Sequence, residues 1–178
     1  PIEAIQDVAG TCFRVPSFDY IYDYVKLPAF DTVKCDKHAF AEAFKNEYLE
    51  QDPIRGKRLA QQNGEWCVVA NPPALPLSEA EMDEIYDLPY QRTYHPVYEA
   101  AGGVPAIQEV QFSLVSQRGC FGGCNFCAII SHEGRIIQRR SHASLLREAK
   151  LLTQLPGFKG YIHDVGGPTA NFRRPSCD

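Results

Sequence analysis

Apolar and polar positions alternate with a helical period in the first third of the chain. Phe40, Phe44 and Tyr48 recur at every fourth position, with polar residues and good helix formers between them. Pro53 cannot donate a backbone hydrogen bond and would end such a helix. The pattern therefore predicts a helix over residues 37–51.

Start signals and apolar stripes predict two further helices. Ser78 followed by Glu81 is a capping-box pattern, which predicts a short helix over Glu79–Asp87. Ser141 is a second capping residue, and the amphipathic pattern after it runs to Leu155. The apolar stripe of this helix consists of Leu145, Ala149, Leu152 and Leu155.

A β-hairpin is predicted where residues 57–62 and 65–70 flank Asn63-Gly64. Asn-Gly is the usual centre of a type I′ turn, in which both central residues have positive φ. Alternation along the second strand places three side chains on one face: Trp66, Val68 and Ala70.

The last third of the chain predicts a βαβ unit. Residues 110–115 read as a strand, and a glycine-rich segment with three cysteines follows at once. After the helix 141–155, a second strand is predicted over residues 159–165, closed by Gly166-Gly167-Pro168. Strands joined through a helix are typically parallel, so the predicted fold class is α/β with a parallel sheet or barrel.

Charge divides the chain into two regions. Residues 1–108 carry 9 basic and 17 acidic side chains, whereas residues 109–178 carry 9 and 5. We expect 1–108 to be a mixed α+β connecting region and 109–178 to have a different role. Within the first region, residues 1–36 and 89–106 lack periodicity, which predicts an irregular segment and an extended connection.

Composition excludes several classes of protein. An apolar share of 44% and a charged share of 22% are typical of globular proteins rather than disordered ones. No apolar run approaches the ~18 residues of a membrane span. The basic region also lacks the Lys/Arg stripe with interleaved aromatics that nucleic-acid platforms show. Because the chain begins at Pro1 rather than Met, we expect a piece of a longer protein.

Cysteines carry the strongest chemical signal. Cys120, Cys124 and Cys127 form a C-x3-C-x2-C motif directly after the predicted strand. Three thiolates this close in sequence can hold one inorganic centre. A structural zinc site usually has four protein ligands, whereas an iron–sulfur cubane with three protein ligands leaves one iron open for chemistry. The motif therefore favours an iron–sulfur site that takes part in a reaction. A non-catalytic zinc- or iron–sulfur-binding module is the alternative.

The other cysteines give no ligand pattern. Seven cysteines, an odd number, fit a disulfide framework poorly and indicate a reducing, cytoplasmic setting. Cys12, Cys35 and Cys67 have no partner spacing, so we expect buried free thiols there. Cys177 is not assigned.

The cysteine motif, with Phe126 before its third cysteine and a βα unit around it, resembles the radical S-adenosylmethionine (radical SAM) superfamily. This resemblance covers residues 109–178, which would be the first part of a partial TIM barrel, about two βα units. It implies a 4Fe–4S cluster on the three cysteines and reductive cleavage of SAM to a 5′-deoxyadenosyl radical. It also places Phe126 beside the adenine and the backbone of Gly166 and Gly167 at the methionine amino group, although the acid that usually follows these glycines is absent.

Several segments together resemble the YgiQ-type branch of the superfamily: residues 1–5, 92–96, 116–124 and 160–172. The resemblance implies that residues 1–108 are the rear of an amino-terminal region of cobalamin-binding-domain character plus a connector. Cobalamin would then bind upstream, if at all. An electron donor such as flavodoxin or ferredoxin is implied, with the substrate undefined. A transfer-RNA-modifying radical SAM enzyme shares the triad, but residues 1–108 contain no pattern of an RNA-binding module.

Two sets of polar residues near these motifs have more than one interpretation. Arg135, Arg139 and Arg140 could neutralise cluster thiolates, bind the SAM carboxylate or form a solvated basic face. His163 and Asp164 precede the glycines at the carboxyl end of a strand, where barrel enzymes place catalytic side chains. They could equally have a structural role in packing or hydrogen bonding.

Residues 109–178 are too few to form a whole barrel. Since these 70 residues supply only about two of the βα units of a barrel, we expect the isolated piece to be inactive.

Overall fold

The computed structural model describes residues 5–167 and 172–173. Pro168 of the predicted glycine turn and Cys177 lie outside the described residues. The chain forms two compact units, Pro1–Leu75 and Pro76–Asp178. The predicted boundary near residue 108 concerns the roles of two sequence regions and stays a prediction.

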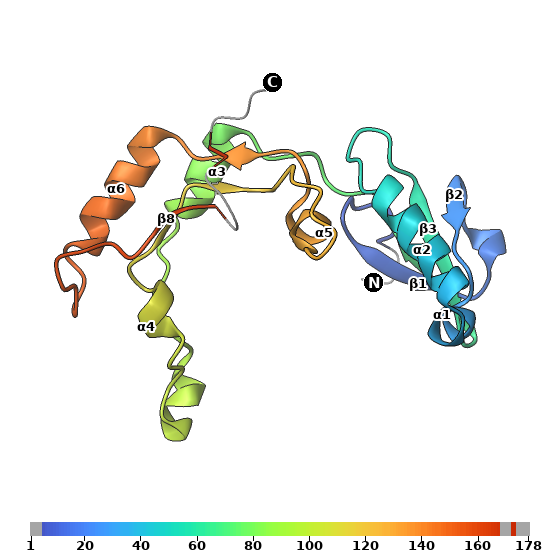
Figure 1. Ribbon diagram of the computed structural model, residues 1–178, viewed down its shortest axis with the longest axis horizontal. Helices are drawn as coiled ribbons and strands as arrows, with labels where there is room; N and C mark the ends of the chain where they lie inside the picture. The colour runs from blue at the N-terminus through green and yellow to red at the C-terminus, as the bar shows by residue number, and fades with distance from the viewer. Residues whose placement is uncertain (1–4, 168–171, 174–178) are drawn as a thin grey trace. The chain divides into compact units, whose positions relative to one another are not determined.

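The first unit is built on a four-stranded sheet in the order β1-β4-β3-β2 (Figure 1). β3 (Arg58–Asn63) and β4 (Trp66–Ala70) form an antiparallel hairpin, and β1 (Cys12–Val15) pairs antiparallel with β4. β2 (Tyr24–Lys26) pairs parallel with β3. The expectation that residues 1–36 are irregular is therefore wrong, because these short strands depend on partners far along the chain.

The hairpin is confirmed, but its turn lies one residue later than predicted. Asn63 pairs with Trp66, so Gly64 and Glu65 are the turn residues. Of these positions only Gly64 has positive φ, at +59°, which is the type II′ pattern rather than type I′. A shift of register by one residue would move Cys67 and the rest of its face out of the core, so burial selects the observed pairing.

The core of the first unit lies on one face of this sheet. Its buried residues are Val15, Ile21, Ala60, Cys67 and Val69, with Phe13, Phe18 and Tyr24 packed against them. Ile21 follows a short 3-10 helix, η2 (Phe18–Tyr20). Trp66 and Val68 alternate onto the opposite face and are exposed.

Two helices, α1 (Phe30–Cys35) and α2 (Lys37–Leu49), connect the parallel strands β2 and β3. The predicted helix over residues 37–51 is thus confirmed, with Asp36 as its cap: the His38 N–H donates to Asp36 Oδ1 at 2.8 Å. α2 buries its small residues, Ala39 and Ala43. The aromatic residues that predicted the helix are exposed: Phe40, Phe44 and Tyr48.

The second unit confirms both capped helices. α3 (Glu79–Tyr86) begins at a complete capping box formed by Ser78 and Glu81. α6 (His142–Leu152) begins at Ser141, whose hydroxyl accepts from the Ser144 N–H at 3.0 Å. The predicted apolar stripe forms the core of this unit, which consists of Phe112, Leu114, Leu145 and Leu152 with Ala149, Leu155, Phe158 and Ile162 around them.

The predicted strands of the second unit are shorter than expected. β5 (Leu114–Val115) pairs parallel with β8 (Val165–Gly166), and α6 lies between them in the sequence. The βαβ connectivity is confirmed, while Val110 and Tyr161 lie outside the strands. A second pair, β6 (Gln117–Arg118) and β7 (Gln138–Arg139), is antiparallel. The closed or partial barrel stays a prediction.

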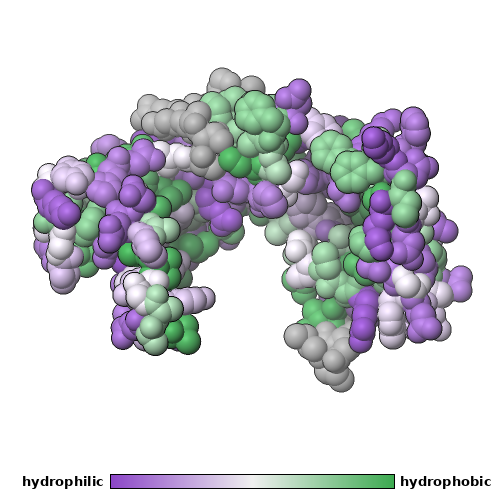
Figure 2. Space-filling view, turned by 60° about the horizontal axis from the view of Figure 1, so that its bottom comes forward, coloured by the Kyte–Doolittle hydropathy of each residue, from purple (hydrophilic) through white to green (hydrophobic). Residues whose placement is uncertain are grey.

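The remaining elements are short helices. They are η3 (Pro96–Ala101), α4 (Ile107–Val110) and α5 (Ile129–Glu133). Residues 89–106 are therefore not simply extended, because His95 caps η3 and Gly102, at φ +89°, ends it. Within the part of the chain described, no helix combines the length and apolar character needed to cross a bilayer. The face in Figure 2 mixes hydrophilic and hydrophobic residues, as folded proteins usually do.

Candidate functional site

The three motif cysteines lie in one loop of the second unit. This cysteine loop, residues 119–137, leaves β6 and returns at β7, and the pairing of the two strands closes its base. Inside the loop, the Cys120 N–H donates to the carbonyl of Gly134 at 3.0 Å. The Gly119 N–H donates to Glu133 Oε2 at 3.1 Å. These bonds hold the start of the loop against its far side.

The three thiols differ in exposure. Cys120 is 6% exposed, Cys127 is half-buried and Cys124 is exposed. A Cβ on Gly122 would lie 3.3 Å from Cys120 Sγ and 3.7 Å from Cys124 Sγ, so this glycine leaves space beside both sulfurs. The Cys127 N–H donates to the Cys124 carbonyl at 3.1 Å in a tight turn. The loop thus brings two thiols to one glycine, with the third a turn away.

Aromatic side chains accompany the cysteines. Phe126 is 88% exposed, so it has little protein around it, and its predicted place beside an adenine stays a prediction. The neighbouring Phe121 packs on Phe172, with ring centroids 4.2 Å apart. Phe121 therefore has a partner ring although it is 54% exposed, whereas Phe126 is available to a ligand.

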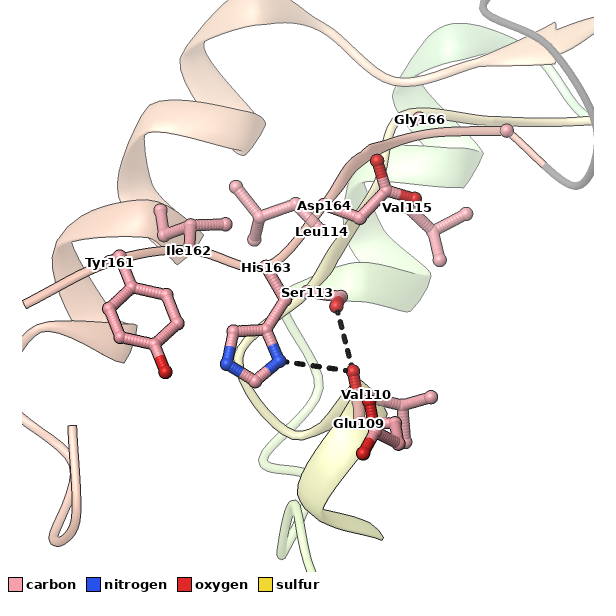
Figure 3. A pocket seen from close by; sticks show the side chains of 11 residues that line it. Glu109, Val110, Ser113, Leu114, Val115, Tyr161, Ile162, His163, Asp164 and Gly166 are labelled. Atoms are coloured by element: carbon pink, nitrogen blue, oxygen red, sulfur yellow. Dashed lines mark hydrogen bonds between the residues drawn. The ribbon is translucent and has the colours of Figure 1, made fainter. Parts of the chain in front are cut away.

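Gly166 and Gly167 line an open pocket of about 660 Å³ at the end of β8 (Figure 3). His163 and Asp164 line it too, together with Glu109 from α4. The His163 Nδ1 donates to the Glu109 carbonyl at 3.2 Å, and its ring stacks on Tyr161. His163 is thus held by the scaffold, while the pocket offers backbone groups and carboxylates.

A backbone contact links this pocket to the start of the cysteine loop. The Ser116 N–H donates to the Gly166 carbonyl at 2.8 Å, and Ser116 directly precedes β6. Within the described residues, the Ser116 hydroxyl is buried and has no hydrogen-bond partner. Buried polar groups normally have partners, so this hydroxyl has capacity for a water or a ligand atom.

Sequence reasoning missed the role of Arg140. Its side chain is fully buried and pairs with Glu148 of α6, so it is part of neither a solvated basic face nor a ligand contact. Arg139 pairs with Glu79 at 2.9 Å on the surface. The available signal is the recurrence of Ser144 and Glu148 four residues apart in this amphipathic helix, next to the apolar stripe, which marks a polar strip on its buried side.

Tyr86 of α3 covers the Arg140 side chain. The guanidinium carbon lies 4.1 Å from the centre of the Tyr86 ring, a favourable cation–π distance. Burial raises the pKa of the Tyr86 hydroxyl, and the nearby Arg140 charge offsets this only in part. Tyr86 therefore stays neutral across the physiological range.

A family model described as "Radical SAM N-terminal" matches residues 1–113 of this chain. The chain belongs to the radical SAM superfamily. A UPF0313 protein of Clostridium botulinum (strain ATCC 19397 / Type A) is 55% identical over 176 residues, covering 99% of this chain and 27% of the relative. A UPF0313 protein of Clostridium perfringens (strain SM101 / Type A) is 54% identical over 174 residues, covering 97% and 26%.

The UPF0313 relatives confirm the resemblance of this chain to the YgiQ-type branch of the superfamily. The chain spans about 27% of the length of the C. botulinum relative. No solved structure matches this chain.

The cysteine loop fits the iron–sulfur cluster that radical SAM proteins generally bind. Its donor set is three thiols, the ligands that such clusters prefer, and Gly122 leaves space where a Cβ would crowd two of them. As placed, no three Cys, His, Asp or Glu side chains among the described residues form a metal-binding group. A cluster on this loop would therefore have to draw the three thiols together.

The remaining described cysteines of this radical SAM chain lie in the first unit. Cys67 is buried, as predicted, and burial raises the pKa of its thiol. It lies 3.2 Å from Gln62 Oε1. Cys12 and Cys35 are exposed, so the prediction that they are buried is wrong. Cys12 is on an edge strand and Cys35 ends a short helix, which explains their exposure.

Proposed function

We propose that this chain is the part of a radical SAM enzyme that binds a 4Fe–4S cluster through Cys120, Cys124 and Cys127. The observation that supports this most is the loop itself. It places a C-x3-C-x2-C motif between β6 and α5, with two of its sulfurs around Gly122. Family membership by itself implies an enzyme of undefined reaction; the ligand assignment depends on the loop.

Three cysteines would hold only three of the four irons of such a cluster, which would leave one iron for SAM to bind. When bound, the cluster supplies the electron that cleaves SAM to methionine and a 5′-deoxyadenosyl radical. An electron carrier such as flavodoxin or ferredoxin would deliver that electron.

The described residues contribute binding and positioning. Buried Cys120 would anchor one side of the cluster, and exposed Cys124 and half-buried Cys127 would supply the other two thiolates. Phe126 offers an exposed ring to the adenine. Gly166 and Gly167 line the pocket at the end of β8 and present backbone groups to the methionine amino group. Asp164 adds a carboxylate beside Gly166.

Anaerobic reconstitution of the chain with iron and sulfide tests the proposal. We expect about four irons per chain, a broad visible absorption and an electron paramagnetic resonance (EPR) signal after reduction with dithionite. SAM should change this signal by binding at the open iron. Tight binding of colourless zinc, with no cluster under any of these conditions, would contradict the proposal and favour a non-catalytic metal module.

A further inference from the structure

The base of the cysteine loop is closed by more than the pairing of β6 and β7. Directly after β7, the Arg140 N–H donates to the Ser116 carbonyl at 3.1 Å, which extends the ladder by one step. Ser116 and Arg140 therefore form the outermost backbone contact of this ladder, on the side away from the cysteines. Anything that holds Arg140 also holds the base of the loop.

The Arg140 side chain is 0% exposed, and its contacts among the described residues are all inside the fold. Nη1 donates to the Val115 carbonyl at 3.0 Å and to Glu148. Nη2 donates to the Ser144 hydroxyl at 2.8 Å. One guanidinium thus joins the end of β5 to α6, close to the start of the cysteine loop. Its nitrogens donate to separate acceptors in a rigid fork geometry, which lysine cannot reproduce.

Glu148 serves two arginines. Its Oε1 pairs with Arg92 at 2.6 Å, while its Oε2 accepts from Arg140. Glu148 is 8% exposed and Arg92 is 15% exposed. Loss of either arginine leaves the carboxylate paired with the other, so no isolated charge is buried in either case. The two arginines differ in their other contacts: of the two, Arg140 alone hydrogen-bonds to the strand end and to the base of the loop in the described part of the chain.

We propose that Arg140 is a positioning residue for the cysteine loop: by joining Val115 and Ser116 to Glu148 and Ser144, it holds Cys120 buried and ready for cluster binding. The inference rests on the proposed function for its purpose, but its structural consequence can be measured without metal. Release of the loop base should raise the frequency of local opening around Cys120.

A matched pair of variants, Arg140→Met and Arg92→Met, tests the inference in the full chain. Each removes one arginine from Glu148 and replaces it with an apolar side chain of similar length. The first measurement is the rate of alkylation of Cys120 in the metal-free protein, followed by peptide mass spectrometry. We expect an increase on the order of tenfold for Arg140→Met and little change for Arg92→Met. The second measurement is iron per chain and the EPR spectrum after reconstitution, which should be impaired only in Arg140→Met.

The outcomes separate the inference from the proposed function. Equal alkylation rates in the two variants, or equal loss of cluster, would overturn the positioning role. A wild-type chain that binds no cluster would contradict the proposed function, while the alkylation rates would still decide the role of Arg140. If thermal unfolding shows that Arg140→Met does not fold, Arg140→Lys takes its place, because lysine keeps the charge beside Glu148 but not the fork. A smaller increase in the alkylation rate of Cys120 is then expected, and a rate equal to that of wild type would overturn the inference.

Discussion

Gly119, in the cysteine loop, has no room for a side chain. Its φ is +91°, and a Cβ would lie 2.4 Å from the Ile136 carbonyl oxygen. Gly119→Ala should therefore cost about 1–3 kcal/mol of unfolding free energy, measured in urea, and should lower iron uptake. Gly123→Ala is the matched control, since its Cβ would meet nothing within 4 Å. We expect that variant to stay within about 0.5 kcal/mol of wild type, and equal costs would contradict this view of the loop.

The cysteines make a second prediction at the residue scale. Serine variants of Cys120, Cys124 and Cys127 should each abolish cluster assembly, because hydroxyls bind iron far less well than thiolates. Serine variants of Cys12 and Cys35, which are exposed, should leave iron per chain unchanged. Cys67→Ser should also retain iron. A similar fall in iron in both groups would show that the ligand assignment is wrong.

At the scale of elements, α6 depends on the cap at Ser141. Ser141→Ala removes the acceptor for the Ser144 N–H and should cost about 1 kcal/mol of unfolding free energy. Ser141→Asn should recover most of this loss, because asparagine caps helices equally well. Urea unfolding of the three proteins measures both effects, and failure of asparagine to rescue would mean that the serine acts by other contacts.

Asp83 joins α3 to α6 and gives the pair a pH dependence. Burial of Asp83 by itself would raise its pKa, but hydrogen bonds from Ser141 and the charges of Arg147 and Arg140 outweigh this and lower the pKa below 3.8. The ionised carboxylate therefore stabilises the fold above about pH 3.8, and this contribution is lost as the pH falls through the lowered value. In urea unfolding, the stability gap between wild type and Asp83→Asn should narrow from pH 6 to pH 3; a constant gap would contradict the linkage.

At the scale of the whole molecule, β5 and β8 form a sheet of only two strands among the described residues. The pocket beside them is open, and Val115 and Val165 are exposed. A site that does not exclude water supports radical chemistry poorly, so we expect no release of 5′-deoxyadenosine from SAM and dithionite by the 178 residues. A full-length UPF0313 relative is the positive control. Equal turnover by both would show that the described fold suffices.

Features that depend on neighbours in sequence could be predicted from the sequence alone. The capping box at Ser78, the stripe that defines α6 and the cysteine spacing are local, because a helix turn or a metal loop uses residues only a few positions apart. The helix α2 was predicted from its aromatics, yet the structure buries Ala39 and Ala43 instead. The spacing of the apolar residues predicts that a helix forms, whereas the face that the helix buries depends on what packs against it.

Only the tertiary structure decided the pairing of distant segments. Cys12 lies opposite Ala70, so β1 exists because β4 offers it a partner, and the Gly64 turn takes the register that buries Cys67. In the sequence, Arg140 is one of the three arginines between the cysteine motif and α6. Its burial against Glu148 follows from the approach of α6 to the end of β5. The contacts of Cys12 with Ala70 and of Arg140 with Val115 join residues far apart in sequence and gain their free energy from burial and hydrogen bonding. No local pattern of side chains encodes that proximity.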